Sequence, residues 1–178
     1  MGQFLNMMID SSRRGRGYAE KLMVGIRPEQ AARKPHFESA GAVQVVDMNH
    51  PTFCFGHLSL YPAKLLALVG QEPGAAEPAA GWAELFSAGV ACQDDPDGRI
   101  YPRFDECAAA FLRSMDTAYA ALAKVDDAVL STPTANERYR EFFPTTGIAL
   151  NFMLNSHVLV HAGQVSAWRR CFGLPSAM

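Results

Sequence analysis

The sequence predicts an all-α fold, because helical periodicity recurs along the chain and strand patterns are almost absent. Four segments carry apolar residues at the i, i+3, i+4 and i+7 spacing of a helix with one buried face. The only strand candidate is the short run 42–46. A length of 178 residues favours one domain. We therefore expect residues 1–178 to form a single four-helix bundle.

The first two helices are expected at residues 2–24 and 49–68. Two glycines near the middle of the first segment weaken its helical pattern, since an interior glycine costs about 1 kcal/mol relative to alanine. In the second segment Asn49 is a suitable N-cap, and Pro51 is tolerated in the first turn. Pro62 lies inside the pattern and has no backbone N–H, so it should kink the helix or divide it in two.

The last two helices are expected at residues 103–125 and 144–172, the latter ending before Gly173 and Pro175. Residues 103–125 carry the clearest apolar stripe in the chain. Between the second and third helices, residues 70–102 are rich in proline and glycine and predict a long loop insertion. A short helix at residues 82–88 is compatible with this insertion, which should pack across the bundle or form part of a lid.

Composition excludes several classes of protein. The net charge is −2, 19% of residues are charged, and the only basic cluster is short, so nothing predicts a nucleic-acid partner. No uncharged apolar run approaches the roughly 20 residues that span a bilayer. The four cysteines form no CxxC pair, and no signal peptide is evident at the N-terminus. These features predict a cytoplasmic protein with reduced thiols.

Histidines are the candidate functional residues. His157 and His161 are four positions apart in the fourth helix, so both lie on one otherwise apolar face, which should also include Val160. They are either packed core histidines that bond to neighbours, or two ligands of a metal ion. His57, in the middle of the second helix, is a candidate third ligand. Val158 replaces the glutamate of an HExxH motif, so a zinc peptidase is not expected.

Further residues are candidates for lining the pocket of such a site. Tyr61 follows His57 by one helical turn, while Gln164 and Trp168 follow His161 by one and two turns. His50, at the start of the second helix, is a weaker candidate. Cys54 is near enough to consider, although a small structural residue is the simpler interpretation.

The sequence resembles the DinB/YfiT-like superfamily of metal-dependent proteins, in an uncharacterised bacterial branch. The resemblance rests on Gly56-His57-Leu58 and on the segment HVLVHAGQ at 157–164, with NFMLNSH at 151–157 and SAWRR at 166–170. It implies an up-down-down-up four-helix bundle and frequent homodimers. It also implies a divalent metal held by His57, His157 and His161. The long insertion at 70–102 departs from compact members of the family.

Three functions remain open at this stage. The first is a metal-dependent transferase or hydrolase for a small-molecule substrate, using zinc or nickel to activate water or a low-molecular-weight thiol, as the family's thiol-dependent transferases do. The second is a non-catalytic metal-binding or stress-response protein. The third is an interaction module that binds no metal and keeps the histidines as core residues.

Overall fold

The computed structural model describes residues 2–177, and within them the chain is mostly helical with one small two-stranded sheet. The all-α class predicted from the sequence is confirmed, apart from that sheet. The long helical elements are α1 Gln3–Met23, α3 Pro51–Ser59, α4 Tyr61–Leu68, α6 Phe104–Leu122, α7 Thr146–Asn151 and α8 His157–Cys171. Shorter elements are α2 Pro28–Ala31, β1 His36–Ser39, β2 Ala42–Val45, α5 Trp82–Phe86 and the 3-10 turns Gly74–Ala76, Asp127–Ser131 and Glu137–Tyr139.

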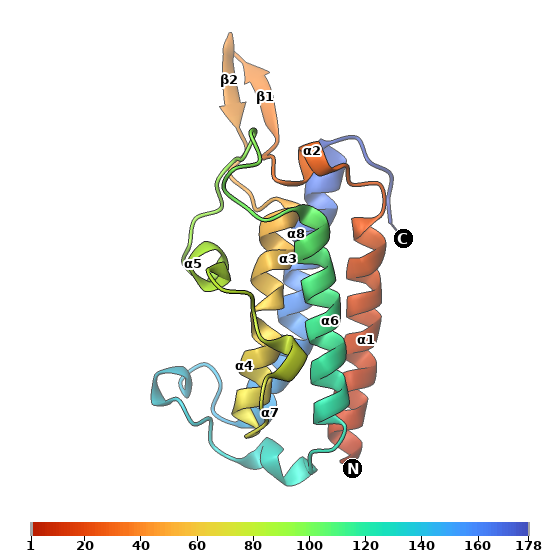
Figure 1. The fold of residues 1–178 in the computed structure, drawn as a ribbon, viewed down its shortest axis with the longest axis vertical. Coiled ribbons are helices and arrows are strands. Elements are labelled where there is room, and N and C mark those ends of the chain that lie inside the picture. The colour runs from red at the N-terminus through yellow and green to blue at the C-terminus, as the bar shows by residue number, and fades with distance from the viewer. Residues whose placement is uncertain (1, 178) are drawn as a thin grey trace.

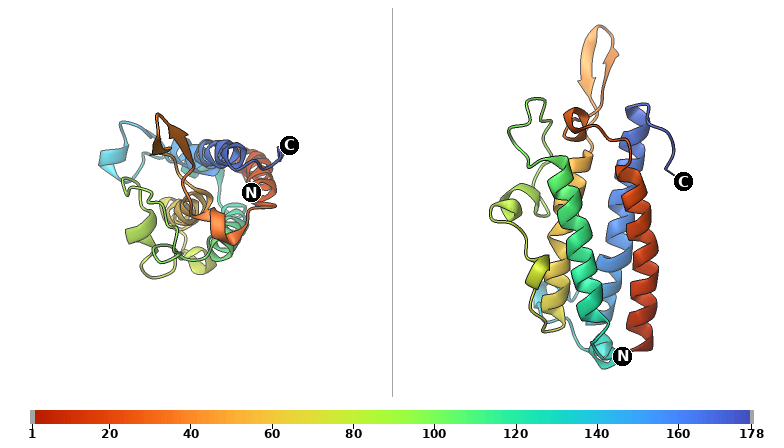
Figure 2. Two further views of the ribbon diagram at one scale, coloured as in Figure 1. Left: turned by 90° about the horizontal axis from the view of Figure 1, so that it is seen from above. Right: turned by 45° about the vertical axis from the view of Figure 1, so that its right-hand side comes forward.

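The long helices lie side by side along one axis (Figures 1 and 2). In Figure 1, α1 and α8 run upward, while α3, α4 and α6 run downward. α3 packs against both α6 and α8, and α1 packs against α8. The core between them is built from fully buried side chains such as Phe55, Phe111, Leu150 and Trp168. This packing brings the last turn of α3 next to the start of α8.

The predicted second helix is divided in two. α3 ends at Ser59 and α4 begins at Tyr61, with Leu60 between them. Pro62 occupies the first turn of α4, where its missing N–H leaves no helical hydrogen bond unmade. The expected break at Pro62 is therefore confirmed, and it falls one turn after His57.

The predicted fourth helix contains a π-helical turn, Phe152–Ser156, between α7 and α8. A π turn widens the helix and changes its hydrogen bonding, and such turns are frequent at functional sites. The buried Ser12 of α1 donates a hydrogen bond to the Leu154 carbonyl in this turn, at 2.7 Å. α1 thus supports the distorted turn that precedes His157.

The buried face of α8 differs from the predicted one. Val160 was expected to face inward, but it is 56% exposed, whereas Ala162, two residues later, is buried. The core-facing stripe is centred on Val158 and Val165, so it is rotated relative to the predicted face. His157 and His161 consequently lie at the edge of the core rather than at its centre.

The connection between α1 and α3 contains structure that the periodicity did not predict. It forms the short helix α2 and a β-hairpin in which His36 pairs with Val45 and Ser39 pairs with Ala42. The strand candidate at 42–46 corresponds to β2. The hairpin projects beyond one end of the long helices (Figure 1). Its strands are exposed on both faces, so no alternation of apolar and polar residues marks them.

The insertion between α4 and α6 is ordered by local hydrogen bonds and by one aromatic anchor. The buried Asp95 carboxylate accepts hydrogen bonds from the backbone N–H groups of Arg99, Ile100 and Tyr101. α5 corresponds to the short helix expected at 82–88 and ends two residues earlier. Its Phe86 is fully buried and stacks against Tyr101. Phe86 also packs edge-on against Phe53, which attaches the insertion to α3.

No helix within residues 2–177 combines the length and the apolar character that crossing a membrane requires. The four cysteines are all free thiols, three of them buried.

A buried arginine ties the end of α1 to α8 and to the C-terminal tail. Arg169 is 4% exposed, and its guanidinium donates hydrogen bonds to the carbonyls of Leu22, Val24 and Pro175. We expect Arg169→Ala to lower the free energy of unfolding by about 2–4 kcal/mol, because three backbone carbonyls lose the hydrogen bonds of a buried, charged donor. Urea titration followed by circular dichroism measures this change. Arg170→Ala removes an exposed neighbouring arginine and should change stability by less than about 0.5 kcal/mol. Equal stabilities for the two variants would contradict the assigned role.

Candidate metal centre

Three buried histidines from two helices meet at one point. His57 comes from α3, and His157 and His161 come from the first turns of α8. The Nε2 atom of His157 lies 3.0 Å from Nε2 of His57 and 3.1 Å from Nε2 of His161. The structure therefore brings together the three residues that the sequence nominated as ligands, and these residues could hold a metal ion.

The orientation of His57 is fixed by the insertion. Its Nδ1–H donates a hydrogen bond to the Phe86 carbonyl at 2.6 Å, which leaves a lone pair on Nε2. Phe86 can approach because Gly56 has no side chain: a Cβ at Gly56 would lie only 2.5 Å from the Phe86 ring. Close packing of the Phe86 ring therefore explains why the residue before His57 is a glycine. Phe86 was not predicted as a partner of His57, because the contact is made by its backbone carbonyl, and residues of every type have one.

The orientation of His161 is fixed by Gln164, one turn later in α8. The His161 Nδ1–H donates to Gln164 Oε1 at 2.8 Å, so the Nε2 atom of His161 also carries a lone pair. Asn49 Nδ2 and the Cys54 thiol donate to the same amide oxygen, at 3.2 and 3.6 Å. The Asn49 amide and the Cys54 thiol both fit an oxygen at this position, and the His161 tautomer is assigned accordingly. Gln164 is therefore a positioning residue for His161.

His157 is the ring whose hydrogen bonding the protein leaves incomplete. Its Nδ1 is buried and has no partner. Its Nε2 faces two nitrogens that are already fixed as acceptors, yet a neutral imidazole can donate to only one of them. At least one close nitrogen pair therefore has no hydrogen between its atoms. A cation placed among the three Nε2 atoms would turn this repulsion into attraction.

The distances from His157 Nε2 to the other two Nε2 atoms suit a tetrahedral metal, and all three atoms lie within 4.8 Å of one another. Zinc–imidazole bonds of about 2.0–2.1 Å at tetrahedral angles place two nitrogens about 3.3–3.4 Å apart. The observed separations of 3.0 and 3.1 Å need only a small expansion to reach this value. Among residues 2–177 no further histidine, cysteine or acidic side chain joins the cluster. Three protein ligands with one remaining position are typical of catalytic zinc sites.

Burial keeps the three imidazoles in the neutral form that binds metals. Desolvation, with repulsion from His161 and His57, lowers the pKa of His157 to about 3. Desolvation and the charge of His57 lower the pKa of His161 to about 4. The pKa of His57 is also lowered, chiefly by desolvation. All three rings are therefore uncharged at neutral pH.

Aromatic side chains and one cation surround the histidines. The Tyr61 ring lies 4.2 Å from the His157 ring and 4.9 Å from the His57 ring, measured between centroids. Phe152, in the π-helical turn, stacks on His157. The Lys64 ammonium sits 4.7 Å from the centre of the Tyr61 ring, and no ion pair involving Lys64 occurs among the described residues. Sequence reasoning missed Lys64 and Phe152.

The four predicted pocket residues separate into two pairs. Tyr61 and Gln164 contact the histidines as described above. Trp168 is fully buried elsewhere: its indole N–H donates to the Arg33 carbonyl and its ring stacks on Phe172. His50 caps α3, where its Nδ1 accepts the Phe53 N–H and its Nε2 faces the Gln93 carbonyl. Both of these side chains are engaged in structural contacts away from the three histidines.

Cys54 does not supply a reactive thiolate. The side chain is completely buried, and burial raises the pKa of its thiol far above the usual range. A thiol that stays protonated is a poor nucleophile and a poor metal ligand. Cys54 instead acts as a small core residue whose S–H points to Gln164.

Comparison of the chain with protein-family models, with curated proteins and with solved structures found no match.

Proposed function

We propose that this protein is a metal-dependent enzyme, a transferase or hydrolase, whose zinc or nickel ion is bound by His57, His157 and His161. One observation carries the proposal: outer hydrogen bonds direct the Nε2 lone pairs of His57 and His161 toward His157. Two facing lone pairs in a dry core are unfavourable without a cation. The absence of a fourth protein ligand among residues 2–177 favours a site open to a small molecule over a closed structural site.

A metal in this position would lower the pKa of a water or of a thiol that it binds. The protein contributes the surroundings of that group. Lys64 places a positive charge beside Tyr61, where it would attract an anionic small-molecule substrate. The Tyr61 ring lies against two of the three histidines, and we propose that its hydroxyl orients a bound group. A low-molecular-weight thiol is the proposed co-substrate.

We also propose membership of the DinB/YfiT-like superfamily, on the resemblance in sequence and on the helix order. The directions of α1, α3 with α4, α6 and α8 fit an up-down-down-up bundle (Figure 1). The positions of the three histidines on α3 and α8 fit the ligand set that this family implies. Within this proposal the protein is bacterial, cytoplasmic and homodimeric, and its partners include neither nucleic acid nor membranes.

The metal site is tested by metal analysis of protein purified with a tag that is then removed. We expect about one zinc or nickel ion per chain, and we expect His157→Ala to retain less than about a tenth of it, because losing one of three ligands removes most of the affinity. His36→Ala, which changes an exposed histidine of the hairpin, is the matched control. Circular dichroism confirms that both variants are folded. Unchanged metal content in folded His157→Ala protein would rule out the proposed site.

The role of Gln164 is tested by competition with a chelator. Gln164→Leu keeps the size of the side chain but removes the acceptor that orients His161, so zinc affinity should fall about 10–100-fold, as is usual when such an outer partner is lost. Gln164→Glu retains an acceptor and should bind zinc more tightly than Gln164→Leu. Equal affinities for the two variants would show that the hydrogen bond to His161 does not affect the metal.

An open site is tested with a thiol and its oxygen analogue. N-acetylcysteine should raise the melting temperature of the zinc-loaded protein, because binding to the folded state stabilises it. N-acetylserine should have a much weaker effect, and neither compound should affect the metal-free protein. If the thiol has no effect on the loaded protein while the metal itself stabilises the fold, the non-catalytic metal-binding function becomes the better description.

A further inference from the structure

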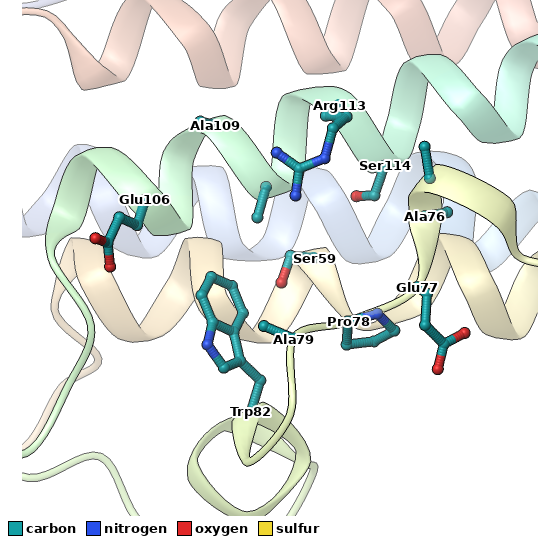
Figure 3. A pocket seen from close by; sticks show the side chains of 12 residues that line it. Ser59, Ala76, Glu77, Pro78, Ala79, Trp82, Glu106, Ala109, Arg113 and Ser114 are labelled. Atoms are coloured by element: carbon teal, nitrogen blue, oxygen red, sulfur yellow. The ribbon is translucent and has the colours of Figure 1, made fainter.

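A second cavity lies away from the histidines, between α6 and the insertion (Figure 3). Its volume is about 430 Å³, which is within the usual range of small-molecule sites. Side chains of α6 form one wall, Trp82 and Pro78 of the insertion form the other, and Ser59 of α3 lies at the base. None of the three candidate metal ligands lines this cavity.

The cavity exists because α6 presents small side chains where the insertion passes over it. Ala109 and Ala110 lie between Glu106 and Arg113, and these four positions share one helical face. The opposite wall is held in place. Trp82 packs edge-on against Phe86, one turn further along α5, and Phe86 is buried against α3. The hollow is thus formed in advance and bordered by a large flat indole.

Charged groups of opposite sign lie at two points of the α6 wall. Arg113 and Glu106 are seven residues apart, which corresponds to about 10 Å along the helix. Among the residues that the structure describes, neither side chain forms an ion pair. Both side chains line the cavity, and the Arg113 guanidinium extends over it toward Ser59 and Trp82 (Figure 3).

Two serine hydroxyls add polar groups to the floor. Ser59 and Ser114 are buried and donate to the carbonyls of Gly56 and Phe111, at 2.7 and 3.0 Å. Their protons are therefore committed to backbone acceptors, while the lone pairs on their oxygens remain able to accept a hydrogen bond. The floor therefore offers hydrogen-bond acceptors to a bound molecule.

We propose that this cavity binds a small aromatic molecule with an anionic group at one end of its ring and a cationic or donor group at the other. The ring stacks against Trp82, the anion pairs with Arg113 in bidentate fashion, and the donor end lies toward Glu106. An aliphatic ligand would forgo the stacking. A ligand with a single charge would forgo one of these two charge-assisted contacts.

Isothermal titration with three matched probes tests the proposal on the full-length protein. The probe 4-(aminomethyl)benzoate carries both charges, 4-methylbenzoate lacks the amine and 4-methylbenzylamine lacks the carboxylate. We expect the first to bind, and each of the others to bind at least about tenfold more weakly, because each loses one charge-assisted contact. Equal affinity of either singly charged probe would overturn the assignment of the two ends.

Variants locate the bound probe. Arg113→Gln and Glu106→Gln change exposed side chains of α6, so folding should be unaffected, and each should weaken 4-(aminomethyl)benzoate about tenfold. Arg14→Gln, an exposed arginine of α1 outside the cavity, is the control and should bind normally. Quenching of tryptophan fluorescence by the probe should disappear in Trp82→Phe protein. Absence of binding, or binding that Arg113→Gln and Trp82→Phe leave unchanged, would refute the site.

Discussion

The limited hydrogen-bonding capacity of neutral imidazole governs the arrangement of the three histidines. Each of the three rings has two nitrogens but only one proton, and burial lowers the pKa values so that a second proton is not acquired. Two rings place their protons outward, on the Phe86 carbonyl and on Gln164. Their remaining lone pairs then point at His157. The three rings can therefore satisfy only part of their hydrogen-bonding capacity among themselves. A cation bound to the Nε2 atoms would remove the remaining repulsion.

Helix irregularities on both sides position the cluster. The break between α3 and α4 places Tyr61 at the start of a new helix, against the rings of His57 and His157. On the other side, the π-helical turn places Phe152 against His157, and Ser12 of α1 supplies a hydrogen bond to that turn. Regular helices through both segments would present different side chains at this point. The departures from ideal geometry therefore coincide with the candidate site.

Residue type and spacing predicted part of this arrangement. The four-residue interval placed His157 and His161 on one face of a helix, and Pro62 marked the division of the second helix. Periodicity could not show that the buried face of α8 is rotated away from Val160, since packing against α1 and α3 decides it. Nor could periodicity predict that the Phe86 carbonyl accepts a hydrogen bond from His57, or that the Phe86 ring requires a glycine at position 56. Both depend on where the insertion crosses α3, which is a long-range property.

The insertion links the two candidate sites physically. α5 offers the Phe86 carbonyl to His57 on one side, and its Trp82 forms the wall of the second cavity on the other. The rings of Phe86 and Trp82 are in direct edge-on contact, with centroids 5.5 Å apart. A shift of α5 that moved Trp82 would also move the acceptor that holds the His57 tautomer. Because the Phe86 ring packs directly against the backbone of Gly56, the position of α5 relative to α3 is closely constrained. Residues 70–102 therefore form a structural part of the candidate metal site and also cover one side of the helices.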